Sequence, residues 1–141
     1  MYSSHKLVYI LTSLECIEKC FIYIGEFQSE KDFYSANNQM NFNAAQILLQ
    51  TIGEESKKIE VDLKGQFQNV PWSNIANLRN RIAHDYRGTD PHIVFDVIKN
   101  YLLPLKLAFI EMLAQIDYDL YNLNAALESE HYKNIRYLLK K

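Results

Sequence analysis

The sequence predicts an all-α protein: an antiparallel four-helix up-and-down bundle with an additional C-terminal helix. Apolar residues recur at three- and four-residue steps through most of the chain, which is the period of a helix with one buried face. Gly and Pro number only 4 and 3 among 141 residues, so few residues break the chain into short elements. No stretch of any length alternates apolar and polar residues as a strand would. We therefore expect helices that pack through their apolar stripes around one core.

Length and composition favour one domain spanning residues 1–141. The formal net charge of −2 argues against a broad electrostatic grip on nucleic acid, and leaves room for a small basic site. The sequence has no signal-peptide pattern and no apolar run that could cross a bilayer, so we expect a cytoplasmic protein without a membrane partner. Cys16 and Cys20 share a helix face, where we expect small apolar core residues and neither a disulfide nor a metal pair.

The first helix is expected from about Ser4 to about Gly25, with Ser3 or Ser4 as its cap. A short helical turn follows, because Ser29 and Asp32 resemble a weak capping box. A second long helix should cover residues 38–63. Its predicted inner stripe consists of Met40, Ala44, Ile47, Leu48, Thr51 and Ile52.

Gly53 sits inside the pattern of the second helix, where glycine costs about 1 kcal/mol against alanine. Two explanations are open at this point. Either another helix approaches closely, or tertiary packing tolerates the slack.

The boundaries of the later helices are predicted from N-cap residues and helix-breaking residues. Ser73 is the expected N-cap of a third helix over residues 73–87, which Gly88 closes. Asp90 should cap a fourth helix that begins at Pro91 and is kinked or interrupted at Pro104. Asn122 or Asn124 is expected to start a helix in the tail, whose apolar positions are Leu123, Leu127, Ile135 and Leu138.

The third helix carries an anomaly in the stretch "RNRIAHDY", residues 79–86. A helical wheel places Arg79 inside the apolar stripe formed by Ile75, Ile82 and Tyr86. Burying an unpaired guanidinium costs several kcal/mol, so Arg79 must find an acceptor or lie at a wet cleft. If the stripe is exposed, it also predicts a two-fold homodimer built on this helix.

Two further pairs lie four residues apart in the same stretch. Asn80 and His84 are close enough on a helix for the amide to orient the imidazole. Arg81 and Asp85 should face outward as a second pair that only solvates the surface.

Ordinary structural roles are open for these residues as well. Arg79 could stack on Trp72 or pair with Glu54 or Glu55 of the second helix. His84 could be a plain surface histidine, and the tyrosine that follows could be a core residue with a hydrated hydroxyl.

"RNRIAHDY" matches the Arg-x4-His-x-Tyr motif of the HEPN superfamily, in the form found in HepT toxins. The flanking sequence resembles this family too, with Ile-Gly-Glu at residues 52–54, Pro-Trp at 71–72 and Leu-Pro at 103–104. The resemblance covers about residues 5–115. The C-terminal extension, residues 117–141, has no counterpart in it, and could be a dimer, partner or lid element.

The resemblance implies a metal-independent endoribonuclease that acts as a homodimer and needs no cofactor. Arg79 and His84 would be catalytic, with the imidazole moving protons and the guanidinium binding the phosphate. Asn80 would orient His84 or bind phosphate.

The resemblance also implies regulation by a partner. A nucleotidyltransferase antitoxin would inactivate the enzyme by attaching AMP to Tyr86, as in a type VII-like toxin–antitoxin module. The alternative is a non-catalytic helical subunit that binds a substrate or partner for a nucleotidyltransferase.

Overall fold

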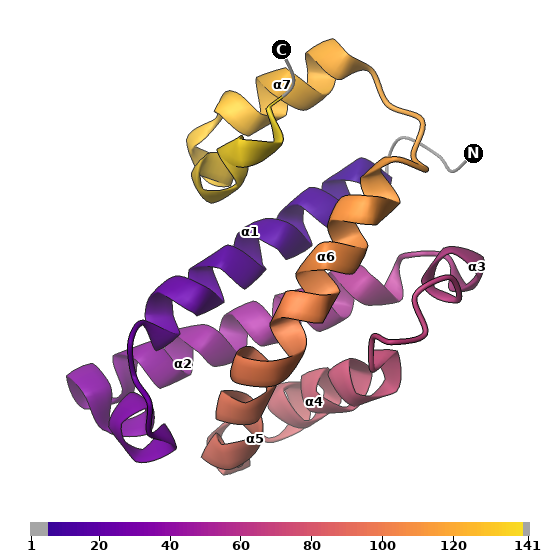
Figure 1. Ribbon diagram of the computed structural model, residues 1–141. Helices are drawn as coiled ribbons and strands as arrows, with labels where there is room; N and C mark the ends of the chain where they lie inside the picture. The colour runs from indigo at the N-terminus through magenta and orange to yellow at the C-terminus, as the bar shows by residue number, and fades with distance from the viewer. Residues whose placement is uncertain (1–5, 140–141) are drawn as a thin grey trace.

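The computed structural model describes residues 6–139 as a bundle of helices (Figure 1), and no strand occurs in this range. The elements are α1 (Lys6–Ile24), α2 (Glu30–Lys57), α3 (Val61–Lys64), α4 (Trp72–His84), a 3₁₀ turn η1 (Tyr86–Gly88), α5 (Pro91–Asp96), a π-helix η2 (Val97–Tyr101), α6 (Leu102–Leu113), α7 (Leu120–Glu128) and a 3₁₀ helix η3 (Glu130–Leu138).

Four helical rods form the bundle. α1 and α2 run antiparallel along each other, α4 packs on α2, and the continuous rod of α5, η2 and α6 returns across α1 and α2 (Figure 1). The all-α bundle predicted from the sequence is confirmed. Its centre is filled by side chains that are almost fully buried, namely Phe33, Phe109, Ile10, Leu11, Leu14, Ile17, Ile52, Leu63, Ile82, Ile98, Leu102 and Leu105.

The boundaries around the first loop agree with the predictions. α1 ends at Ile24, and Gly25 leaves the helix with a φ of +52°, which a glycine adopts without strain. The Ser29 hydroxyl accepts a hydrogen bond of 3.1 Å from the backbone N–H of Asp32 and so caps α2. The predicted caps of α1, Ser3 and Ser4, lie outside the described residues.

α2 departs from the prediction in its buried face. Met40 and Ile47 are 63% and 59% exposed, so the predicted stripe is wrong at these positions, while Ile52 is buried as predicted. The helix also ends at Lys57 and does not continue to residue 63. The residues that α2 buries are Phe33, Phe42, Ala45, Gln46, Leu49, Ile52, Gly53 and Ser56. Three of these are not hydrophobic, and a pattern of apolar spacing could not find a face that is partly polar.

A break divides α2 into a short first part and a long second part, as expected. Asn37, Asn38 and Gln39 have φ values of 51°, 57° and 69°, in the left-handed region that non-glycine residues rarely adopt. The Asn37 amide donates to Asn41 Oδ1 at 2.8 Å, and Asn41 donates to the carbonyl oxygen of Tyr23 at 2.7 Å. These bonds help to hold the reversal in place.

α4 begins one residue earlier than predicted. Pro71 is at the N-cap position and Trp72 is the first helical residue, so Ser73 is not the cap. The Trp72 indole N–H donates to the carbonyl oxygens of Lys64 and Phe67, both at 3.2 Å, and its ring packs edge-on against Phe109. The indole anchors the start of α4 to the preceding loop and to α6.

α4 also ends earlier than predicted, at His84. Asp85 leaves the helix with φ −147° and ψ 69°, and its carboxylate accepts a hydrogen bond of 3.1 Å from the N–H of Gly88. This local bond competes with continuation of the helix. Tyr86 therefore belongs to η1, and its predicted alignment with Arg79 along one helix is wrong.

The fourth rod follows the prediction closely. Asp90 caps α5 by accepting a bond of 2.9 Å from the N–H of His92, and Pro91 is the first helical residue. The interruption expected from Pro104 is confirmed as the π-helix η2, which lies just before it. Proline has no N–H and its ring crowds the carbonyl four residues back, and the wider π turn relieves both problems.

The C-terminal segment packs on α1. Asp119 caps α7 by accepting a bond of 2.7 Å from the N–H of Tyr121, so the predicted starts at Asn122 and Asn124 are wrong. The buried Glu15 accepts two bonds from Asn134, of 3.1 Å and 2.7 Å, which fix η3 to α1. The predicted apolar positions of this segment, Leu123, Leu127, Ile135 and Leu138, are all buried.

Figure 1 shows this segment and α4 on opposite sides of the bundle. A lid over α4, one of the roles open at the outset, is therefore not what the segment forms in this chain.

Cys16 and Cys20 are free and buried, as the sequence suggests. Burial raises the pKa of the Cys16 thiol to about 11 and that of Cys20 further still. Both cysteines are core residues.

Candidate functional site

The motif region begins where α4 crosses α2. Gly53 lies under Arg79 so closely that a Cβ atom there would collide with the Arg79 Cβ and lie 2.8 Å from its Cγ. Of the two explanations for Gly53, close approach of another helix is therefore confirmed. The glycine lets the stem of Arg79 lie directly on the α2 backbone, which fixes where its guanidinium emerges.

The guanidinium of Arg79 has two partners. Its Nη2 donates to Glu54 Oε1 at 3.4 Å, and its Nη1 donates to Asn80 Oδ1 at 3.0 Å. Its Nε is buried and has no hydrogen-bond partner within the described chain. The pairing with a glutamate of α2 is confirmed. The stacking on Trp72 is not what forms, since that ring contacts Phe109 and the Lys64 ammonium group.

Asn80 serves Arg79 and not the imidazole. Its amide oxygen is the acceptor for the Arg79 guanidinium, so the predicted Asn80–His84 hydrogen bond is wrong. His84 is exposed in the last turn of α4, where it and Asn80 line an open cavity of about 400 Å³ with the turn of residues 88–90. An exposed imidazole of this kind can exchange protons with a ligand that enters the cavity.

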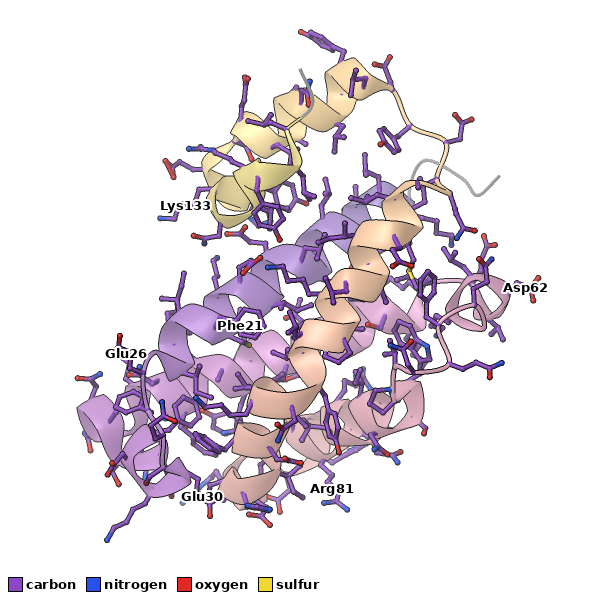
Figure 2. All side chains as sticks on the ribbon, in the orientation of Figure 1. Phe21, Glu26, Glu30, Asp62, Arg81 and Lys133 are labelled. Atoms are coloured by element: carbon purple, nitrogen blue, oxygen red, sulfur yellow. The ribbon has the colours of Figure 1, made fainter. Side chains whose placement is uncertain are left out.

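The outward pair predicted in this helix does not form. Arg81 is exposed and points away from the bundle (Figure 2), while the Asp85 carboxylate is occupied by the backbone of the turn after α4.

Tyr86 lines a different cavity. Its side chain is 38% exposed, so the alternative of a core tyrosine is wrong. Together with Arg87 it faces a hollow of about 460 Å³, whose other wall is formed by α2 residues Phe42 and Gln46. The structure thus brings Arg79, Asn80 and Glu54 together. His84 and Tyr86 line two separate hollows.

The exposed face of α4 is not the stripe that the helical wheel selects. Ile75 and Ile82 are 6% and 1% exposed, because they pack into the core of their own chain. The residues of α4 that face solvent on one side are Ala76, Asn80, Ala83 and His84. Any second protomer that docks on α4 would meet this polar face of small residues, beside Arg79.

Two features of the site were not predicted from the sequence. Gln46, 1% exposed, has a buried Oε1 atom without a hydrogen-bond partner in the described chain. The signal that could have found it is its position within the run "AAQILLQ", since a glutamine at helical spacing from core residues lies on the buried face of the helix. The second feature is the contact of Gly53 with Arg79, which depends on how two distant helices cross.

Among residues 6–139 no three histidine, cysteine or acidic side chains converge in a way that could hold a metal ion. No helix of the described chain has the length and apolarity needed to cross a membrane.

Comparison with known proteins gives a consistent match. The family model described as Ribonuclease HepT-like matches residues 12–113, which run from α1 to the end of α6. The chain is 34% identical over 97 residues to a Methanocaldococcus jannaschii protein provisionally named RNase MJ1380, covering 62% of this chain and 89% of the relative. It is 31% identical over 95 residues to a Thermococcus cleftensis protein provisionally named ribonuclease HepT, covering 66% and 86%.

A third relative is longer. The chain is 25% identical over 111 residues to an M. jannaschii protein named as a gamma-glutamylcyclotransferase and provisionally as an RNase, and the match spans 79% of this chain and 47% of that protein. No solved structure matches the chain with significance.

Proposed function

The chain belongs to the Ribonuclease HepT-like family, and we propose that it is a metal-independent endoribonuclease whose active site forms where the α4 helices of two protomers meet. The observation that carries this proposal is Arg79. Its guanidinium is held at a fixed place by Gly53, Glu54 and Asn80, and its side chain is still 27% exposed, with the exposed His84 five residues further along the same helix.

The proposed chemistry uses the RNA 2′-OH as the nucleophile. That oxygen attacks the adjacent phosphorus, its proton passes to a base, and the 5′-oxygen leaves with a proton from an acid. The products are a 2′,3′-cyclic phosphate and a 5′-OH. His84 suits both proton transfers, because an imidazole titrates near neutral pH. Arg79 suits the charge that develops on the phosphate oxygens, because its planar fork can donate two parallel bonds.

Asn80 takes a supporting role that differs from the first expectation. Its amide oxygen holds one arm of the Arg79 guanidinium, so it orients the phosphate-binding group and leaves the imidazole free. The contact to Glu54, at 3.4 Å, is longer than an ordinary charge-assisted bond, and a phosphate oxygen can replace it. A non-catalytic binding subunit is the alternative if no RNA is cut.

A second protomer supplies what one chain lacks. The reaction needs a base and an acid, and each motif offers one histidine. The nearby His92 is engaged with Glu30 at 3.2 Å. Two copies of α4 that meet through Ala76 and Ala83 would bring both His84 side chains to one cleft, since small residues let helices approach closely.

We expect the protein to sediment at about twice its chain mass of 16.6 kDa at micromolar concentration. Ala83→Glu should shift this species to the monomer and reduce cleavage, because it places a charge at the proposed contact. Val61→Glu, at a residue 79% exposed on α3, is the matched control and should remain a dimer. A parent protein that sediments as a monomer throughout this range contradicts the shared cleft.

Control by a partner nucleotidyltransferase is the second part of the proposal, with the chain as the toxin of a toxin–antitoxin pair. The Tyr86 oxygen would bond to the α-phosphorus of ATP, pyrophosphate would leave, and the phenolic proton would pass to the partner's base. The attached AMP adds negative charge and bulk, which oppose RNA phosphate. The exposure of Tyr86 supports access to its hydroxyl.

Incubation with the cognate nucleotidyltransferase and ATP should add one or more AMP units to Tyr86 and stop RNA cleavage. Tyr86→Phe should fold, cleave RNA and escape modification, as mass spectrometry of the tryptic peptides can show. Tyr121→Phe, at a tyrosine of α7 that is 78% exposed and lies outside the hollow that Tyr86 lines, is the matched control and should be modified like the parent. Silencing of the parent with Tyr86 unmodified would mean inhibition by complex formation alone.

A further inference from the structure

The hollow beside Tyr86 has the size and composition of a small-molecule site. Its volume is about 460 Å³, within the range of pockets that hold nucleoside-sized ligands. One wall comes from α2 through Tyr34, Phe42 and Gln46, and the other from η1 through Tyr86 and Arg87. Elements far apart in the sequence therefore build it together.

Gln46, which lines this hollow, carries a buried polar atom that lacks a partner. The side chain is 1% exposed, and its Oε1 accepts no hydrogen bond within the described chain. A buried carboxamide oxygen without a donor is costly to a fold, and such atoms in native proteins call for an explanation. A ligand with an N–H group that enters the hollow would supply the missing donor.

The aromatic wall depends on the break in α2. Because residues 37–39 take left-handed conformations, the first part of the helix turns back and Tyr34 meets the Phe42 ring edge-on, with centroids 4.9 Å apart. Gln39, one of the residues with a positive φ, lines the hollow itself. Strained backbone of this kind persists where the surroundings enforce it, and it gathers at binding sites. Planar ligands stack on such aromatic surfaces.

The mouth of the hollow carries a positive charge. Arg87 is exposed and forms no hydrogen bond or ion pair within residues 6–139. A free guanidinium beside an aromatic cavity suits a ligand with a planar ring at one end and a phosphate at the other.

We propose that this hollow binds a nucleobase. The base lies against Tyr34 and Phe42, one of its N–H groups donates to Gln46 Oε1, and the phosphate of the same nucleotide pairs with Arg87. This inference rests on the proposed function, because two nucleotides can supply the base: a residue of the RNA substrate that flanks the cut, or the AMP carried by Tyr86. The chemistry of recognition is the same for both.

The first test measures binding without catalysis. AMP and CMP should bind the unmodified homodimer with millimolar affinity and shift the side-chain amide signal of Gln46 in ¹⁵N-resolved spectra. Ribose 5-phosphate, which has the phosphate and no base, should bind at least about tenfold more weakly. Equal binding of ribose 5-phosphate and the nucleotides would overturn the proposal.

Gln46→Met keeps the length of the side chain and removes its hydrogen bonds. It should weaken AMP binding by about fivefold, the loss expected for one hydrogen bond. Gln115→Met, at an exposed amide paired with Gln66, is the control and should bind AMP like the parent. Arg87→Gln gives a second variant at an exposed position that cannot disturb the core, and it should also weaken AMP. Parent-like AMP binding by both Gln46→Met and Arg87→Gln would contradict the site.

Two further measurements separate the sources of the base. If RNA fills the hollow, free AMP should inhibit cleavage competitively and Gln46→Met should raise KM with little change in kcat. If AMP on Tyr86 fills it, the modified protein should show the shifted Gln46 signal and bind no further AMP. Either result supports the proposal, and the absence of both contradicts it. Failure to cleave any RNA would refute the proposed function alone, since AMP binding is measured without cleavage.

Discussion

Replacing Arg79 or His84 with alanine is expected to lower the rate of RNA cleavage by about 10³-fold or more, while helical content stays that of the parent. A positioned acid or base contributes about 10²–10⁴-fold to a reaction, and a charged donor at the reacting centre contributes a similar factor. The assay is single-turnover cleavage of a short single-stranded RNA, with helicity followed by circular dichroism.

Loss of activity in these variants should be separable from loss of fold. His84 is exposed, and the Glu54 carboxylate that Arg79 leaves behind is 41% exposed, so neither change strands a buried charge. His131→Ala and Lys133→Ala, in the C-terminal segment on the far side of the bundle, are matched controls that should cut at the parent rate (Figures 1 and 2). Parent-like cleavage by either Arg79→Ala or His84→Ala would remove the role assigned to that residue.

Gly53→Ala is expected to damage both stability and activity, although alanine favours helices. The new Cβ would collide with the stem of Arg79, so α2 and α4 must separate. Overpacking of this kind costs about 1–3 kcal/mol, against a gain in helix propensity of about 1 kcal/mol. A displaced guanidinium should lower cleavage by about 10²-fold, because misplacement by about 1 Å has that effect. Urea unfolding and the cleavage assay measure the two effects.

A double substitution isolates the contact. In the Arg79→Gly background the colliding atoms are gone, so Gly53→Ala should no longer destabilise and should add about 1 kcal/mol through helix propensity. The same destabilisation in both backgrounds would mean that Gly53 matters for some reason other than Arg79.

Local signals in the sequence predict much of this fold. Gly25 ends α1, Ser29 starts α2, and Asp90 with Pro91 starts α5, because each acts through its own backbone or a near neighbour. The prediction of the buried face of α2 was wrong, because a face that contains Gln46 and Gly53 is set by the elements that pack on it and not by hydropathy. The predicted end of α4 was wrong, because Asp85 could equally have faced solvent within a longer helix.

The candidate site, too, was predicted only in part from the sequence. The wheel finds Arg79 because a guanidinium in an apolar stripe is anomalous within one helix, and Glu54 was among its expected partners. The separation of Tyr86 from Arg79 follows from the turn at Asp85, and the hollow beside Tyr86 follows from the reversal at residues 37–39. Tertiary contacts between segments that are distant in the sequence decide both of these features, and the spacing of residues along the chain does not predict such contacts.

Identification of the RNA product ends in the presence of a chelator tests the central claim most directly. With excess EDTA, the protein should cut a single-stranded RNA to give a 2′,3′-cyclic phosphate and a 5′-OH, as resolved by mass spectrometry. The same RNA with one 2′-deoxynucleotide on the 5′ side of the cut should resist cleavage at that position, because the nucleophile is missing. Products with a 3′-OH and a 5′-phosphate, cleavage at the deoxy position or a strict need for a divalent metal would each contradict the mechanism assigned to His84 and Arg79.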